Sequence, residues 1–275
     1  TDKGRVYWLK VHEIPEGGRA ARGRSILNIL QKEKEEMITA FIAVKEFSDD
    51  KYLIMATEQG TVKKTVLSAY GNVRKGGINA INLKKNDRLI EVKMTDGTND
   101  IMIGTRNGFA VRFHEKDVRV MGRTATGVRG VRLGKGDKVV GLLVIKRQGM
   151  SVLVVTEKGY GKRSLVEDYR LTGRAGKGVI NLKISHDKTG DVVNTIEVDD
   201  NDTFVVSTKK GIVIRTSVKE IRVMGRATQG VRIIKLQEGD KVVDIAKLTK
   251  DDEIPEGDGG EEWQKGLSEF VKKQN

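Results

Sequence analysis

Short apolar runs separated by glycine-containing turns fill most of the chain, and the whole pattern recurs about every 50 residues. A run rich in β-branched residues, such as 151–156, precedes the turn, and an alternating run, such as 211–215, follows it. Between the two runs stands a Thr-x-x-Gly sequence, whose glycine supplies the positive φ that a tight hairpin needs. This turn occurs five times, with its glycine at Gly4, Gly60, Gly108, Gly159 and Gly211.

Two more markers follow the turn in a constant order. A basic loop ends in a glycine and leads into a third apolar run, and these glycines are Gly23, Gly77, Gly127, Gly178 and Gly230. A polar turn then opens a fourth run, at residues 34–38, 86–90, 136–140, 190–193 and 239–243. About four short strands in every 50 residues are typical of propeller blades. The chain is therefore predicted to be all-β and propeller-like, built of four-stranded repeats of which five are visible.

The first strand of the repeat is missing once. The second, third and fourth strands are expected five times, but the first occurs only four times, at residues 52–57, 101–105, 152–156 and 203–208. A closed ring needs a strand before Thr1, because an open edge strand is prone to aggregation. We therefore expect that the chain begins inside a repeat and that native sequence once lay upstream.

Composition narrows the class of protein. Hydrophobic residues make up 37% of the 275 residues. This share is enough to form a core, so we do not expect the whole chain to be disordered. No apolar run approaches the roughly 18 residues of a membrane span, and residues 1–6 do not begin a signal peptide. Cysteine is absent, which excludes disulfides and thiolate metal sites and fits a reducing compartment. We expect a cytoplasmic protein with no membrane partner.

Charge is distributed unevenly along the chain. The formal net charge is +13, yet residues 251–275 carry eight acidic and three basic side chains, a net of −5, which leaves +18 on residues 1–250. A strongly basic body indicates a polyanion partner, with nucleic acid the first candidate. The chain divides into a basic domain at 1–250 and an acidic linker with a short amphipathic helix at 251–275. Trp263, Leu267, Phe270 and Val271 share one face of that predicted helix.

The sequence offers little for catalysis. His12, His114 and His186 are scattered without metal-ligand spacing, so no metal site is predicted. Residues 159–164 and 173–178 contain glycine and lysine but lack the phosphate-loop spacing. No nucleophile–base pair stands out. We predict that the chain has no catalytic residue, binds no cofactor and is not an enzyme by itself.

Four segments resemble one known family. Glu13-Ile-Pro-Glu-Gly-Gly-Arg-Ala-Ala-Arg-Gly-Arg-Ser-Ile-Leu-Asn28 and the loops at 121–128, 171–179 and 224–231 resemble the C-terminal domain of the DNA gyrase A subunit, over residues 1 to about 249. The resemblance implies a six-bladed pinwheel whose outer rim wraps duplex DNA. It also implies that the partners are the rest of gyrase A and gyrase B, in an assembly of two A and two B subunits, and that the isolated domain is a monomer.

One departure from the family matters. Gyrase A carries a basic Gln-Arg-Arg-Gly-Gly-Lys-Gly box before the first repeat seen in this chain, and that box is absent here. We interpret the absence of the box as truncation of the chain, because the first strand is missing as well. If the chain is not truncated, the absence of the box favours topoisomerase IV. The family's active-site tyrosine lies in another domain, and no tyrosine of this chain stands in a matching motif.

The predicted DNA contacts are the cations of the basic loops and of the hairpin strands, because equivalent positions of a repeat fall on one rim. They are Arg19, Arg22, Arg24, Lys63, Lys64, Arg74, Lys75, Arg112, Arg123, Arg129, Arg132, Lys162, Arg163, Arg174, Lys177, Arg215, Arg226 and Arg232. Similar repeats without a recognition helix favour binding through backbone charge and DNA deformability.

Three functions remain open at this point. The leading hypothesis is the DNA-wrapping domain of gyrase A, which bends DNA and presents it for ATP-dependent strand passage and negative supercoiling. The first alternative is the equivalent domain of the topoisomerase IV C subunit. The second is a propeller scaffold that binds an acidic protein. Tryptophan–aspartate scaffolds carry Trp in each blade, whereas this chain has only Trp8 and Trp263.

Overall fold

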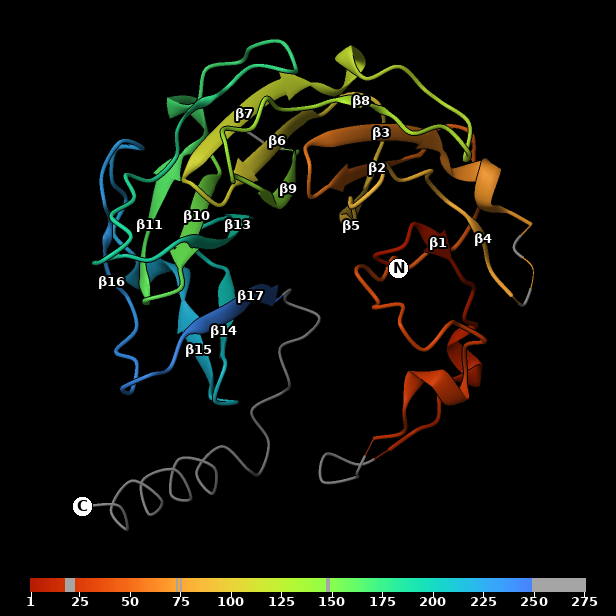
Figure 1. Ribbon diagram of the computed structural model, residues 1–275, viewed down its shortest axis with the longest axis horizontal. Helices are drawn as coiled ribbons and strands as arrows, with labels where there is room; N and C mark the ends of the chain where they lie inside the picture. The colour runs from red at the N-terminus through yellow and green to blue at the C-terminus, as the bar shows by residue number, and fades with distance from the viewer. Residues whose placement is uncertain (18–22, 73, 75, 147–148, 249–275) are drawn as a thin grey trace.

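A computed structural model describes residues 1–17, 23–72, 74, 76–146 and 149–248. These residues form seventeen β-strands and six short 3-10 helices, and no α-helix is found among them. The strands lie in small antiparallel sheets that follow one another around an arc (Figure 1). The prediction of an all-β, propeller-like fold is confirmed. The predicted acidic tail at 251–275 lies outside the described residues and stays a prediction.

Every strand has one of four places in the repeat. The first strands are β2 (Tyr52–Thr57), β6 (Asp100–Thr105), β10 (Ser151–Thr156) and β14 (Thr203–Thr208). The second strands are β1 (Arg5–Val6), β3 (Thr61–Val66), β7 (Phe109–His114), β11 (Tyr160–Leu165) and β15 (Val213–Ser217). The third strands are β4 (Ile78–Asn79), β8 (Val128–Arg129), β12 (Val179–Ile180) and β16 (Val231–Arg232). The fourth strands are β5 (Leu89–Thr95), β9 (Val139–Ile145), β13 (Val192–Val198) and β17 (Val242–Leu248).

Short 3-10 helices lie between these strands. Four of them directly follow a second strand, and they are η3 (Leu67–Tyr70), η4 (Glu115–Asp117), η5 (Val166–Asp168) and η6 (Val218–Glu220). The other two lie in the first repeat and are η1 (Val11–Glu13) and η2 (Ile26–Asn28). No helix of the described residues is long and apolar enough to cross a membrane.

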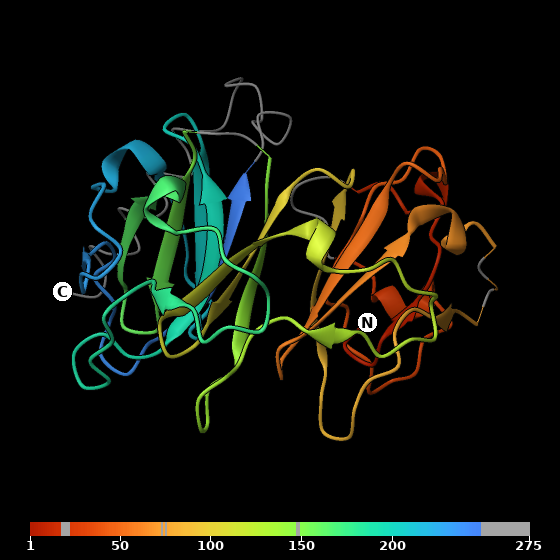
Figure 2. The ribbon, with the colours of Figure 1, turned by 90° about the horizontal axis from the view of Figure 1, so that it is seen from above.

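All sheets but the last take their strands from two repeats. The order β5-β2-β3-β8 combines the fourth, first and second strands of one repeat with the third strand of the next, and β12-β7-β6-β9 and β13-β10-β11-β16 repeat that arrangement. In Figure 2 the segment around β8 crosses to the neighbouring sheet, where Arg129 pairs with Thr61. The sequence pattern predicted the four strands of a repeat but not this exchange, because the tertiary arrangement, and not the local sequence of a strand, decides which strand it pairs with.

The two ends of the arc are incomplete. The last sheet, β15-β14-β17, has three strands, and β1 pairs only with β4 in a two-stranded sheet. The described residues thus form four blade-like sheets and this smaller two-stranded one, rather than the six blades that the resemblance implies. The third and fourth strands predicted for the first repeat, near Gly23 and at 34–38, do not form. Their partners would be a second strand of a preceding repeat and a first strand of the same repeat, and neither is present among the residues that the structure describes.

The core lies between consecutive sheets. Ile54 and Val62 of one sheet pack with Ile103 and Val111 of the next, and equivalent clusters fill the following two interfaces. A fourth cluster joins Leu53 and its neighbours to the first repeat. The fourth strands β5, β9, β13 and β17 face the centre of the arc (Figure 1). The first strands β2, β6 and β10 are buried along almost their whole length, so both of their faces are covered and their sequences are mostly apolar rather than alternating. In the last sheet, β14 alternates between buried and partly exposed positions.

The glycines that end the basic loops make the strand exchange sterically possible. Gly178 has φ +84°, and a Cβ there would lie 2.3 Å from the carbonyl oxygen of Ala110 in the preceding repeat. Gly127 and Gly230 also have positive φ, and a Cβ at either position would likewise lie too close to a backbone carbonyl oxygen of the preceding repeat. The hairpin glycines also have positive φ, as the turn pattern predicted.

We expect Gly178→Ala to lower the free energy of unfolding by about 1–3 kcal/mol, because the side chain forces a strained φ and pushes β12 away from β7. The control is Gly173→Ala in the same loop, where nothing lies within 4 Å of the added Cβ. Urea denaturation measures both variants. Equal stability of the two variants would contradict the close approach.

Candidate nucleic-acid interface

Three equivalent arginines, which we call the loop arginines, lie at the outer edge of consecutive sheets. Arg123, Arg174 and Arg226 each donate a hydrogen bond from Nη1 to a backbone carbonyl at the end of the preceding repeat's third strand. The acceptors are Asn79 at 3.5 Å, Arg129 at 3.1 Å and Ile180 at 3.1 Å. The guanidinium groups remain partly exposed. The strand exchange therefore brings one partly exposed arginine against the third strand of each of three consecutive sheets.

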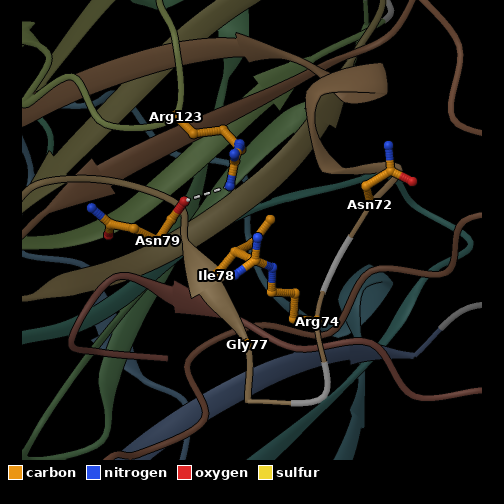
Figure 3. Close-up of a pocket in the computed structure, with 6 residues that line it drawn as sticks. All are labelled: Asn72, Arg74, Gly77, Ile78, Asn79 and Arg123. Atoms are coloured by element: carbon orange, nitrogen blue, oxygen red, sulfur yellow. Dashed lines mark hydrogen bonds between the residues drawn. The ribbon is translucent and has the colours of Figure 1, made fainter.

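The first of these arginines lines an open pocket of about 550 Å³. Arg74 and Arg123 enter it from the loops of two successive repeats, and Asn72, Gly77, Ile78 and Asn79 complete the lining. In Figure 3 both guanidinium groups point toward Ile78 and Asn79. None of the six lining residues is acidic, so the pocket offers two cations and an amide side chain to an anion such as a phosphate.

Most of the predicted loop cations lie at the surface. Arg232 also lies over the ring of Tyr160, with 5.4 Å between its Cζ and the ring centroid. The predicted residues with exposed or partly exposed side chains are Arg24, Arg74, Arg123, Arg129, Arg132, Arg174, Lys177, Arg215, Arg226 and Arg232. Arg19, Arg22 and Lys75 lie outside the described residues.

Three predicted contacts in the second strands point into the protein instead; we call them the strand cations. Lys64 is buried and lies 3.6 Å from the carboxylate of Glu115. Arg112 binds Asp100 at 2.8 Å and the carbonyl of Val166 at 2.9 Å, and Arg163 donates to the carbonyl of Ile221 at 2.6 Å. Each of them thus holds the 3-10 helix of the following repeat, or the residue directly after it. We leave them out of the interface.

Two further predicted contacts, Lys63 and Lys162, are fully buried. Removal from water lowers the pKa of Lys63 from 10.5 to about 8, and the nearby charge of Arg123 adds to that effect. Burial lowers the pKa of Lys162 to about 7, although Asp168 opposes the shift. These two buried lysines are also left out of the interface. The hairpin pattern made all five residues look exposed, because it does not show which elements of the next repeat cover a strand.

The sequence reasoning missed three surface arginines. Arg119, Arg170 and Arg222 are exposed, and each stands four residues before a loop arginine. An exposed aliphatic residue follows each one, Val120, Leu171 or Val223. Their constant offset from the loop arginines was the signal that could have identified them. They add a second cation to each of three consecutive sheet edges.

The described residues contain no cluster of three or more potential metal ligands. His114 Nδ1 accepts a hydrogen bond from the backbone of Lys116, and His186 lies 2.9 Å from Asp191. Two of the three histidines, His114 and His186, therefore have partners within the protein. What the site offers to a ligand is a repeated series of surface cations.

The class of protein follows from this fold and from the comparison with known families. The family described as the DNA gyrase C-terminal domain, a β-propeller, matches residues 1–45, 51–96, 99–146, 151–198 and 202–254. The chain belongs to this family. The five matched segments correspond to the five repeats of the sequence pattern, so the predicted repeat count and family are confirmed.

Two curated relatives are DNA gyrase A subunits. The chain is 44% identical to the DNA gyrase A subunit of Salmonella typhimurium over 262 residues, and 45% identical to that of Escherichia coli over 250 residues. These alignments cover 94% and 91% of this chain but only 30% and 28% of the relatives. The chain thus spans less than a third of the length of the relatives that it matches.

Two solved structures share the architecture. The C-terminal domain of DNA topoisomerase IV superposes with a TM-score of 0.83 at 30% identity, covering 90% of this chain and 77% of that one. The DNA gyrase A C-terminal domain superposes with a TM-score of 0.79 at 25% identity, covering 90% and 80%. Both known structures therefore support the arrangement of sheets described above.

We expect Arg112→Ala to lower the free energy of unfolding by about 2–3 kcal/mol, because it leaves Asp100 and two carbonyls without their half-buried cation. Arg132→Ala removes an exposed arginine and should change stability by less than about 0.5 kcal/mol. Urea unfolding of the two variants is the measurement. A neutral Arg112→Ala would show that this cation does not hold the next repeat.

The buried lysines make stability depend on pH. As pH rises above about 7 to 8 they lose protons in the folded state, whereas unfolded lysine stays protonated up to about 10.5. The unfolded state then binds more protons, so the free energy of unfolding rises with pH across this window. We expect a Lys63→Met, Lys162→Met double variant to lose this rise when urea unfolding is followed from pH 7 to 10. A slope equal to that of the wild type would contradict the assignment.

Proposed function

We propose that this chain is the DNA-wrapping domain of gyrase A, acting in the cytoplasm. Its outer edge bends duplex DNA and presents it to the remainder of gyrase A and to gyrase B, in an assembly of two A and two B subunits. ATP-dependent strand passage and negative supercoiling are then carried out by parts of the enzyme outside this chain. The domain needs no cofactor or metal for its own role. The isolated domain is a monomer.

The observation that carries the proposal is the recurrence of the loop arginines. Arg123, Arg174 and Arg226 make the same backbone contact at three consecutive sheet edges, with Arg119, Arg170 and Arg222 beside them. Duplex DNA carries one charge per ~1.7 Å of its axis, so a curved series of cations matches a bent duplex. Equivalent contacts from similar repeats favour binding through phosphates and DNA deformability rather than through base edges.

Gyrase A is favoured over topoisomerase IV by the curated relatives, which are gyrase A proteins at 44–45% identity. The topoisomerase IV domain has the higher TM-score of the two structures, but both enzymes share this fold. A scaffold for an acidic protein has no specific observation in its favour. The pocket between Arg74 and Arg123 suits a phosphate at least as well as a carboxylate.

We expect the wild-type chain to bind duplex DNA of unrelated sequences with similar affinity, and to lose affinity steeply as salt increases. Each phosphate contact contributes about 0.9 to the log–log slope. Changing Arg123, Arg174 and Arg226 together to Ala should weaken binding and lower that slope by about 2 to 3. Fluorescence anisotropy across a salt series measures both quantities.

The matched control removes three exposed lysines from the segments that lead into the fourth strands, Lys85, Lys135 and Lys235. It deletes the same charge while leaving the outer loops intact, so its slope should stay close to that of the wild type. Equal losses in both triple variants would mean that only net charge matters and would reject the proposed edge. Salt-independent binding by the wild type would reject wrapping itself.

A further inference from the structure

Two lysines occupy the same place inside two different repeats. Lys63 in β3 and Lys162 in β11 are the third residues after their hairpin glycines, and both side chains are 0% exposed. The equivalent residues of the other repeats are Tyr7, Val111 and Ile214, none of which carries a positive charge. The fold therefore does not require a cation at this position. The two lysines need another explanation.

Both ammonium groups hold the backbone of the next repeat's basic loop. Lys63 Nζ donates to the carbonyl of Ala80 at 2.5 Å and to the carbonyl of Arg123. Lys162 Nζ donates to Ser164 Oγ at 2.8 Å and to the carbonyl of Gly225 at 2.9 Å, directly before Arg226. Each buried ammonium thus binds the backbone at or directly before a loop arginine, and the one bound by Lys63, Arg123, lines the pocket with Arg74.

Neither charge is neutralised inside the protein. In the part of the chain that the structure describes, no carboxylate lies within 4.0 Å of either ammonium. Around Lys63, the charged neighbour Arg123 is repulsive, Tyr70 bonds to the carbonyl of Ala80, and Lys64 is paired with Glu115. A buried cation that is hydrogen-bonded but unpaired is costly to retain.

The surroundings of Lys162 are similar. Asp168 attracts it from beyond contact distance, and Arg226 repels it. Tyr169 donates its hydroxyl hydrogen to Asn181, so it offers Lys162 no negative charge. The groups that touch the ammonium are neutral oxygens.

We propose that Lys63 and Lys162 are positioning residues for duplex DNA: each shapes the loop that presents an arginine, and a bound phosphate supplies the counter-charge that the protein lacks. This inference rests on the proposed DNA binding. A phosphate against the loop stabilises the protonated lysine, so binding raises its pKa and is coupled to proton uptake. A deprotonated lysine can still donate its two hydrogen bonds to these oxygens. Raising the pH therefore removes the charge while the contact with the loop backbone remains.

The experiment is calorimetry of the full chain with a duplex oligonucleotide at pH 8, in two buffers with different ionisation enthalpies. We expect uptake of protons on binding, seen as a difference in binding enthalpy between the buffers. If a phosphate raises the pKa of Lys162 by about one unit, affinity should fall up to about tenfold between pH 6.5 and pH 9. A Lys63→Met, Lys162→Met double variant should bind more weakly at pH 6.5 and lose both the uptake and the pH dependence.

Two controls separate charge from packing. Val111→Met disturbs the equivalent position of the intervening repeat without changing charge, and Lys135→Met removes an exposed charge; both should retain proton uptake.

Wild-type binding without proton uptake and with equal affinity at both pH values overturns the inference while leaving the proposed function intact. Retention of uptake by the double variant also overturns it. Absence of wild-type binding at every pH overturns the proposed function itself. If the double variant does not fold, the proton uptake and the pH dependence of wild-type binding still test the inference.

Discussion

The exchange of one short strand between neighbouring repeats is the interaction on which the rest of the architecture depends. Each third strand has only two residues, yet it completes the sheet of the preceding repeat and brings a whole basic loop with it. Gly127, Gly178 and Gly230 allow this crossing because their backbones approach the neighbouring strand too closely for any side chain. Consecutive sheets are thereby linked both by backbone pairing and by a shared apolar core.

The same exchange explains why similar cations have different roles. The strand cations Lys64, Arg112 and Arg163 are covered by the 3-10 helix of the next repeat and hold it through backbone carbonyls. The loop arginines lie only a few residues beyond that helix but on the outside of the exchanged segment. Buried charges thus connect the sheets, and exposed charges form the edge. Moving a cation by a short distance along the chain changes which of these roles it has.

The ends of the arc follow from the same constraint. Among the described residues β15 pairs only with β14, and Val213 on that strand is 65% exposed. In the first repeat, the segments predicted as third and fourth strands have no strand among the described residues to pair with. Their sequences are compatible with strands, but a strand of a few residues is stable only when a neighbour pairs with it.

The sequence alone determined the repeat length, the order of strands, the positive φ of the hairpin glycines, and the concentration of positive charge in the loops. These features depend on local periodicity and on backbone freedom, which neighbouring residues specify. Only the tertiary structure decided which repeat completes each sheet and whether Lys63 or Arg112 faces water or the protein. Those outcomes depend on residues about 50 positions away that pack over the strand. The sequence of a hairpin does not show which residues of the next repeat will cover it.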